Sequence, residues 1–226
     1  MAQQQRWHRF ESADSLASAA VEAVLAAART AIAERGAFHL VLAGGTTPRL
    51  VYEMLARQPA EWGRWHIYFG DERCLPPDDA ERNSRMASEA WLSRVAIPAE
   101  QIFPIAAERG ATVAAEAYSR TLQKVGLFDL VLLGLGEDGH TASLFPGQVD
   151  AEQSSPAIAV FAAPKPPPQR ISLSVRRLNA ARQVMFLVTG AAKAAAVAAW
   201  RRGETIPAAA IAPAAGVDIF LEQGLD

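Results

Sequence analysis

The sequence has little that would place the protein in a membrane or in an oxidising compartment. Its 226 residues include one cysteine, Cys74, so no disulfide can form within the chain. The polar N-terminal residues lack the apolar stretch of a signal peptide. No uninterrupted apolar run approaches the roughly 20 residues that span a bilayer. From these absences we predict a cytoplasmic protein with no membrane partner.

The chain also lacks an excess of charge of either sign. Its 22 Lys and Arg are scattered among 24 Asp and Glu, which gives a formal charge of −2. A protein that holds nucleic acid needs a basic surface, so we expect no nucleic-acid partner. A small anion needs only a local cluster of donors, and the charge balance leaves that kind of ligand open. Half of the residues are apolar, which is enough for a substantial core.

Short apolar runs alternate with helical stretches along most of the chain. An Ala-rich helix is predicted over residues 15–35, and Gly36 is placed to end it. Buried strands are predicted at residues 39–43, 65–69, 128–133, 158–162, 171–174, 184–189 and 217–221. Further helices are predicted at residues 50–57, 84–94, 113–124 and 191–201. Strands that are apolar throughout and alternate with helices indicate an α/β fold, with a mostly parallel, Rossmann-like sheet covered by helices on both faces. No linker divides the chain, so we predict a single domain over residues 1–226.

Ligands of such sheets bind beyond the carboxyl ends of the strands, where this sequence places a glycine-rich segment. Residues 44–48 read Gly-Gly-Thr-Thr-Pro between a predicted strand and a predicted helix. Glycines let the backbone approach a ligand, and the N–H groups at a helix start favour an anion such as phosphate. The same residues also fit a tight turn capped by Thr46 or Thr47. The segment alone does not decide between these interpretations.

Two cations are candidates for binding the same anion. Lys193 lies in the first turn of a predicted helix, where a bound phosphate would turn its unfavourable interaction with the helix dipole into a favourable one. Arg170 opens a predicted strand and can contact phosphate through two N–H groups. Each residue also fits an ordinary surface position, Arg170 on an edge strand.

The longest motif, residues 134–147, combines glycines with a histidine and a carboxylate. It contains G-x-G-x-x-G after a predicted strand, but it lies mid-chain and the later segment 157–163 holds no acid for a ribose. We therefore predict no dinucleotide cofactor. Asp138 and His140 lie inside this loop. A lone histidine is more often structural, but an imidazole beside a carboxylate can act as a general base near neutral pH.

A third polar segment, Asp71-Glu72-Arg73, follows another buried strand. Its three charges fit a salt-bridged loop anchor, and they also fit a site that holds sugar hydroxyls or positions a base. The other histidines show no metal-ligand spacing, so we predict no metal site.

Together these segments resemble the 6-phosphogluconolactonase family. The matches occur in family order at residues 42–48, 70–73 with 76–78 and 83–84, 134–147, 170–173, and 186–190 with Lys193. The resemblance implies an α/β fold shared with the glucosamine-6-phosphate isomerase/deaminase group. It also implies hydrolysis of 6-phospho-D-glucono-1,5-lactone to 6-phospho-D-gluconate in the oxidative pentose phosphate pathway, without a cofactor. The partner is then this small sugar-phosphate lactone, and we expect a monomer or a weak homodimer.

Residue roles follow from the resemblance by motif. His140 would activate the water, and Asp138 would orient or tune it. The resemblance implies that the phosphate is held by Gly44, Gly45, Thr46, Arg170 and Lys193. Asp71 and Arg73 would line the sugar end of the site.

Two alternatives remain from other functional classes. The related deaminases carry a glutamate a few residues beyond the histidine, whereas this sequence has Ser-Leu-Phe-Pro at 143–146. A non-catalytic sugar-phosphate sensor would need a DNA-binding segment, and the 38 residues before the first predicted strand offer one helix. Both differences favour the lactonase.

Overall fold

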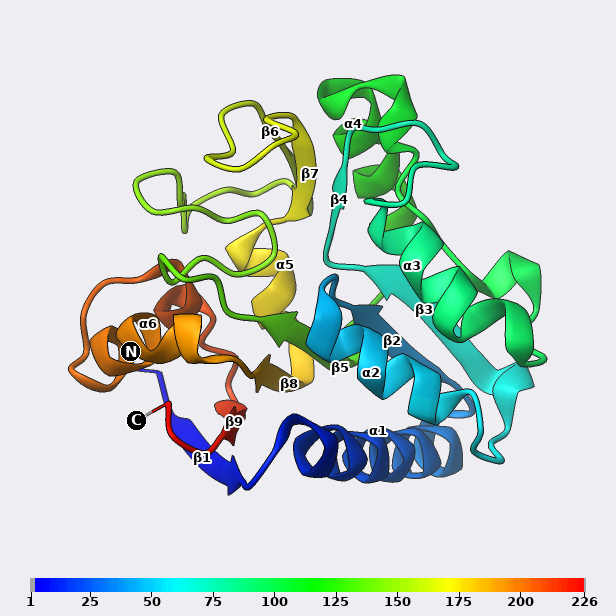
Figure 1. Cartoon of the computed structure of the whole chain (residues 1–226). Coiled ribbons are helices and arrows are strands. Elements are labelled where there is room, and N and C mark those ends of the chain that lie inside the picture. The colour runs from blue at the N-terminus through cyan, green and yellow to red at the C-terminus, as the bar shows by residue number, and fades with distance from the viewer. Residues whose placement is uncertain (1–2, 226) are drawn as a thin grey trace.

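A six-stranded parallel sheet forms the centre of the computed structural model, which describes residues 3–225 (Figure 1). Its strands are β1 (Gln5–Phe10), β2 (Phe38–Leu42), β3 (Trp65–Phe69), β5 (Phe128–Gly134), β8 (Ala181–Val188) and β9 (Val217–Glu222). They lie in the order β1-β9-β8-β5-β2-β3, and every neighbouring pair is parallel. The middle strands are apolar on both sides and almost wholly buried, as expected for a parallel sheet covered on two faces. The predicted fold class is confirmed.

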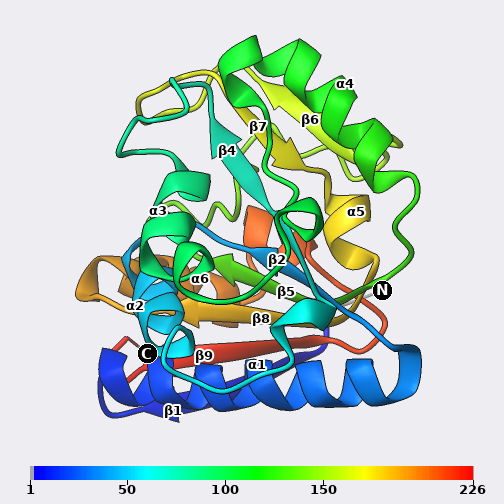
Figure 2. The same cartoon turned by 90° about the vertical axis from the view of Figure 1, so that its right-hand side faces the viewer.

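Helices cover the two faces of this sheet. These are α1 (Ala13–Arg35), α2 (Thr46–Leu55), α5 (Val175–Asn179) and α6 (Ala194–Arg201). Helix α3 (Asn83–Ala90) packs beside α2, and α4 (Ala111–Leu122) packs on a second sheet described below. Single 3₁₀ turns occur at Trp62–Arg64, Leu92–Arg94, Ala99–Gln101, Ala107–Arg109, Ala191–Lys193 and Pro207–Ala210. Helices α1 and α2 pack together below the sheet, and α5 lies on its other side (Figures 1 and 2).

Helix α1 is the one described helix that is long and apolar enough to cross a membrane by length and composition. It begins at a capping box built by Ser12 and Ser15 and ends at Gly36, whose φ of 80° is left-handed. One side is buried through Leu16, Ala20, Val24, Ala28 and Ala31, and that side packs on α2 and on the central strands. This burial at helical spacing is typical of a core helix.

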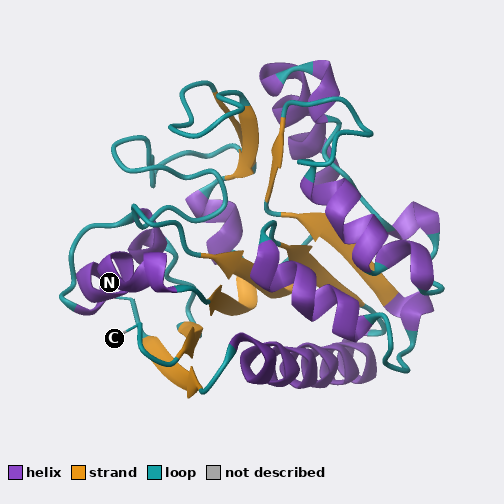
Figure 3. Cartoon of the chain, viewed as in Figure 1, coloured by secondary structure: helices purple, strands orange, loops and turns teal. Residues whose placement is uncertain are grey.

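A second, antiparallel sheet lies apart from the first (Figure 3). It contains β4 (Asp71–Arg73), β7 (Arg170–Leu173) and β6 (Ala157–Val160), in that order. The runs at 158–162 and 171–174 were expected in the parallel sheet, and that prediction is wrong. The connection between them holds no helix, and parallel neighbours need a long crossover, so the two strands pair as antiparallel neighbours.

The expectation that the first strand starts near residue 39 is also wrong. Strand β1 precedes helix α1 and occupies the edge of the parallel sheet beside β9. Arg6 and His8 lie on either side of Trp7 in this strand and reach Asp218 on β9 at 2.8 and 2.9 Å. An edge strand tolerates such polar residues because one side of it meets solvent.

Candidate active site

A pocket with a volume of about 370 Å³ opens where the two sheets meet. Its walls come from the segments that follow β2, β3 and β5, at the carboxyl ends of the parallel strands. The antiparallel sheet contributes Asp71, Arg73 and Arg170, and the turn before α6 contributes Lys193. The pocket therefore lies where ligands of open α/β sheets bind.

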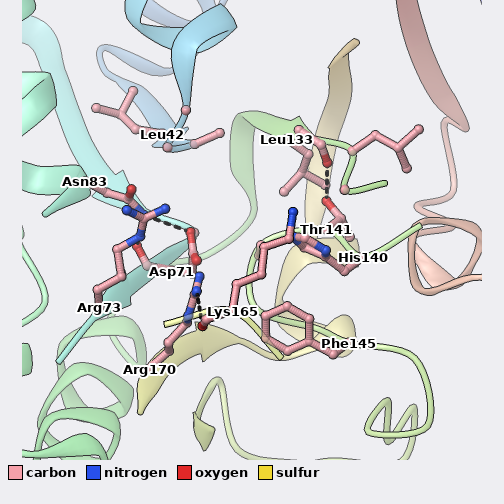
Figure 4. Close-up of a pocket in the computed structure, with 18 of the residues that line it drawn as sticks. Leu42, Asp71, Arg73, Asn83, Leu133, His140, Thr141, Phe145, Lys165 and Arg170 are labelled. Atoms are coloured by element: carbon pink, nitrogen blue, oxygen red, sulfur yellow. Dashed lines mark hydrogen bonds between the residues drawn. The ribbon is translucent and has the colours of Figure 1, made fainter. Parts of the chain in front are cut away.

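The close-up in Figure 4 shows how the side chains are divided around this space. Asp71, Arg73 and Asn83 lie together on one side, and His140 lies with Thr141 on the other. Lys165, Arg170 and Phe145 form the remaining wall in this view.

His140 is paired with Asp138 at the pocket wall. Nδ1 of His140 lies 2.5 Å from Oδ1 of Asp138, and the same oxygen accepts the backbone N–H of His140 at 3.1 Å. Partial burial acts to raise the pKa of Asp138, but these two hydrogen bonds outweigh it and the pKa is lowered. An ionised Asp138 can only accept, so Nδ1 carries the proton in the neutral ring and leaves the lone pair on Nε2. The pair has the arrangement of a base with its orienting carboxylate.

The glycines of the 134–147 motif allow this placement of His140. A Cβ on Gly136 would lie 2.0 Å from Nδ1 of His140, so no larger residue fits without moving the ring. Gly136 N–H also donates to the carbonyl of His140 at 2.7 Å, and the ring packs tilted against Phe145. The G-x-G-x-x-G spacing thus serves close packing of the histidine.

The glycine-rich turn before α2 places its backbone at the pocket. Gly44 and Gly45 line the pocket, while Thr46 is exposed at the first residue of α2 and does not line it. The N-terminus of α2 has no side-chain cap, so the predicted capping by Thr46 or Thr47 is absent. Instead the Thr47 hydroxyl lies 2.6 Å from that of Thr189, which joins this turn to the end of β8. The N–H groups at the start of α2 are left for water or a ligand.

Arg170 is buried, not a surface residue on an edge strand, because β7 is the middle strand of its sheet. It donates from Nη2 to the carbonyls of Lys165 and Pro166 at 2.9 and 3.2 Å, and from Nε to that of Pro167 at 3.2 Å. Burial lowers the pKa of Arg170, and the charge of Asp71 opposes that shift. Arg170 therefore shapes the loop that carries Lys165 as well as facing the pocket.

Three further cations line the pocket from different segments. Lys193 is half-buried at the N-cap of α6, and its ammonium has no hydrogen-bond partner within residues 3–225. Arg73 donates to the carbonyl of Glu81 at 2.8 Å. Lys165 lies 3.5 Å from Glu137, a neighbour of Asp138. Four cations facing one small pocket favour an anionic ligand.

The two carboxylates of β4 are separated by the alternation of the strand. Asp71 faces the pocket, where its oxygens accept from Asn83 and Ser143. Glu72 is fully buried beside Arg82 at 3.2 Å and accepts the first two backbone N–H groups of α3. Glu72 thus serves as the loop anchor, and Asp71 lies where a residue of the site would lie.

Several residues at the pocket were not singled out as site residues from the sequence. Asn83 appeared only within a family match, and Phe145 only within the segment compared with the deaminases. Ser143, which contacts Asp71 behind the pocket wall, lies in that same segment. Lys165, in the proline-rich stretch 164–168, was not considered. Lys165 had a readable signal, because a cation in a stiff loop is held close to whatever the loop faces. No group of three potential metal ligands occurs among residues 3–225.

A family model described as glucosamine-6-phosphate isomerases/6-phosphogluconolactonase matches residues 11–220. The chain belongs to this family. It is 39% identical over 205 residues to the 6-phosphogluconolactonase of Mycobacterium bovis. The matched region covers 84% of this chain and 83% of that protein. It is 34% identical over 206 residues to a probable chloroplastic 6-phosphogluconolactonase of Oryza sativa, covering 83% of this chain. The chain spans 63% of the length of that rice relative.

A solved structure agrees with this membership. The crystal structure of 6-phosphogluconolactonase from Thermotoga maritima superposes with a TM-score of 0.90 at 28% identity, over 97% of this chain and all of that one. The resemblance stated from the motifs is confirmed. The family's description covers both isomerases and lactonases, so membership alone does not choose the reaction.

Proposed function

We propose that this chain hydrolyses 6-phospho-D-glucono-1,5-lactone to 6-phospho-D-gluconate, as a step of the oxidative pentose phosphate pathway. The names of the mycobacterial, rice and Thermotoga proteins support the reaction. The observation that carries the chemistry is the His140–Asp138 pair on the wall of a pocket rich in cations. A lactonase needs an activated water and a hold on an anionic substrate, and this pocket offers groups for both.

In this proposal His140 acts as the general base. Nε2 of the neutral ring takes a proton from water as the water oxygen attacks the lactone carbonyl carbon. The tetrahedral intermediate then collapses, the bond between that carbon and the ring oxygen breaks, and the imidazolium returns the proton to the departing oxygen. Asp138 holds the ring in the correct tautomer and stabilises the imidazolium. Because the hydroxyl leaves as part of the same molecule, the product is one open-chain acid, whose carboxyl group then releases its proton to solvent near neutral pH.

The phosphate is assigned to the cationic part of the pocket. Lys193 and the unfilled N–H groups beside Gly44 and Gly45 offer donors to phosphate oxygens. Arg170 adds positive charge from the antiparallel sheet, while Arg73 lies with Asp71 at the sugar end. Such distant contacts help to position the reacting carbon beside His140.

The segment 143–146 argues against the deaminase alternative. The segment after His140 offers no carboxylate to assist sugar ring opening, and the Ser143 hydroxyl is engaged by Asp71 at 2.6 Å. Hydrolysis needs only water added to a carbonyl, which suits the groups that are present.

The test is a coupled assay in which the purified protein receives phosphogluconolactone and, separately, glucosamine 6-phosphate. The lactone also opens spontaneously, so the rate above an enzyme-free blank is the quantity to compare. We expect a large excess rate with the lactone and none with the amino sugar. Deamination, or a lactone rate equal to the blank, would refute the proposal.

Activity should need no metal and no nicotinamide. We expect the rate to survive extensive chelation and dialysis, because the base, its partner and the cations all come from side chains. Restoration of a lost rate by added zinc or NADP would contradict this expectation. We also place the reaction in the cytoplasm. The chain is proposed to act as one domain and as a monomer or weak homodimer.

A further inference from the structure

Asp71 is a buried carboxylate that faces the pocket without an ion pair. It is 7% exposed, and within residues 3–225 no cation lies at salt-bridge distance from it. Its neighbour Glu72 shows the usual solution for a buried carboxylate, which is a paired arginine. Arg170 acts on the charge of Asp71 only from beyond contact distance. A buried carboxylate without a contacting cation costs free energy, so a group of this kind at a pocket wall is better explained by ligand binding than by stability.

Two neutral donors hold the carboxylate of Asp71. Asn83 Nδ2 donates to Oδ1 at 3.0 Å and to the Asp71 backbone carbonyl at 3.1 Å, while Ser143 Oγ donates to Oδ2 at 2.6 Å. Both donors are buried, Asn83 at 5% and Ser143 at 1% exposure. A carboxylate has about four acceptor positions, so further ones remain for a ligand in the pocket.

The donors are themselves fixed by separate parts of the fold. The backbone N–H of Asn83 donates to Glu72, and a Cβ on Gly44 would lie 2.0 Å from Oδ1 of Asn83. The backbone N–H of Ser143 donates to the hydroxyl of Ser172 on β7 at 3.2 Å. Asp71 is therefore clamped between the start of α3, the phosphate-side glycine turn and the histidine loop, in one orientation.

We infer that Asn83 and Ser143 are positioning residues that fix the Asp71 carboxylate to accept a hydrogen bond from one hydroxyl of the sugar. This inference rests on the proposed function. The substrate's phosphate is repelled by Asp71, so the group that faces this carboxylate is a hydroxyl donor. A fixed, desolvated acceptor discriminates strongly against an analogue that lacks the hydroxyl, because the acceptor is then left unpaired.

The test compares kcat/KM for the phosphorylated lactone with that for its analogues lacking the hydroxyl at C2, C3 or C4. The parent protein should discriminate strongly against one of these analogues. Ser143→Ala should reduce that discrimination by about tenfold, the effect of losing one hydrogen bond to a charged group. Ser143→Cys offers a weak S–H donor in nearly the same volume, so its discrimination should lie between those of the parent and of Ser143→Ala. A purely structural role would lower all the rates together and leave the ratio unchanged.

Ser174→Ala is the matched control. Ser174 is as buried as Ser143, and its hydroxyl caps α5 without touching Asp71. Its loss should lower the melting temperature and leave the discrimination at the parental value. If the ratio moves as much in Ser174→Ala as in Ser143→Ala, the positioning role is refuted.

A binding measurement separates this inference from the reaction itself. By calorimetry, Ser143→Ala should weaken binding of 6-phosphogluconate about tenfold and leave the affinity for inorganic phosphate unchanged. Equal affinities for 6-phosphogluconate in folded Ser143→Ala and the parent would overturn the inference. If Ser143→Ala weakens binding of 6-phosphogluconate as expected but the parent does not hydrolyse the lactone, the proposed function alone is refuted.

Discussion

The two sheets reach the same pocket in different ways. The parallel sheet contributes the loops that follow its strands, such as Gly44–Gly45 after β2 and the His140 loop after β5. The antiparallel sheet contributes side chains from within its strands, and some of them also hold the structure together, as Arg170 does through three carbonyls. Substitutions in the loops of the first sheet should therefore affect activity alone, whereas those in the second should also affect stability.

The sharpest test of the first half of this comparison is His140→Ala. We expect kcat to fall by roughly 10²–10⁴-fold, the usual contribution of a general base. The free energy of unfolding, measured in urea, should change little, because the ring lies at the pocket wall and the backbone hydrogen bonds of its loop remain. Affinity for 6-phosphogluconate should also change much less than kcat.

Asp138→Asn is the companion variant. It should lower kcat less than His140→Ala does. It should shift the acidic limb of the pH–rate profile without abolishing activity. A folded His140→Ala that keeps more than about a tenth of parental kcat would show that the histidine only braces the glycine loop.

The second half of the comparison predicts the opposite outcome for Glu72→Gln. This substitution removes one charge from a fully buried ion pair and weakens the acceptor for the start of α3. We expect the free energy of unfolding to fall by about 3 kcal/mol, the lower end for a broken buried pair, because Arg82 keeps Glu108 at 3.1 Å. The loss of kcat, measured well below the melting temperature, should be far smaller than in His140→Ala.

Glu108→Gln provides the control for that variant. Glu108 pairs with the same arginine, but a third of its side chain is exposed, so the expected loss is about 1 kcal/mol or less. Equal losses in the two variants would mean that burial of Glu72 is not the reason for its effect.

Lys193→Ala tests whether the loop before α6 behaves like the other loops of the parallel sheet. We expect kcat/KM for the phosphorylated lactone to fall by a factor that corresponds to a loss of roughly 2–3 kcal/mol of transition-state stabilisation. This is the range for a hydrogen bond to a charged group. The residual rate on unphosphorylated glucono-1,5-lactone should stay the same, since that substrate makes no phosphate contact. Comparable parental rates on both lactones would contradict the phosphate site.

The same division explains what the sequence could and could not predict. His140 and Asp138 are two residues apart in a glycine loop after an apolar strand, so a local pattern was enough to find them. Ser143 and Asn83 meet Asp71 across 72 and 12 residues, and no local pattern records such a contact. The strands also differed in how well they could be predicted. Apolar runs predicted the central parallel strands, whereas β1 and β4 are polar and contain no apolar run that would mark them as strands.

The smallest expected effect concerns the far ends of two strands that lead to the pocket. His39 on β2 and His66 on β3 stack with ring centroids 4.7 Å apart, and the His66 ring also stacks on Phe103. Burial lowers the pKa of both, and that of His39 is lowered further by His66 and Arg177 and raised by Asp129. The folded protein thus favours the neutral rings, while the unfolded chain takes up protons near pH 6.5. Stability should therefore decline as the pH falls from about 6.5 through the lowered folded-state values.

His66→Phe removes one of these titrating groups and keeps an aromatic ring between His39 and Phe103. We expect its unfolding free energy, measured in urea at several pH values from 7.5 to 5, to decline less steeply than that of the parent. Comparing the two slopes cancels the contribution of the titrating groups away from this pair. The loss of His66 also removes its lowering of the pKa of His39, which flattens the slope in the same direction. The acidic limb of kcat should be unchanged, because the pocket lies at the opposite end of these strands. Parallel stability curves would show that the stacked histidines do not contribute to acid sensitivity, and a shifted kcat limb would show that the two ends of the strands are coupled.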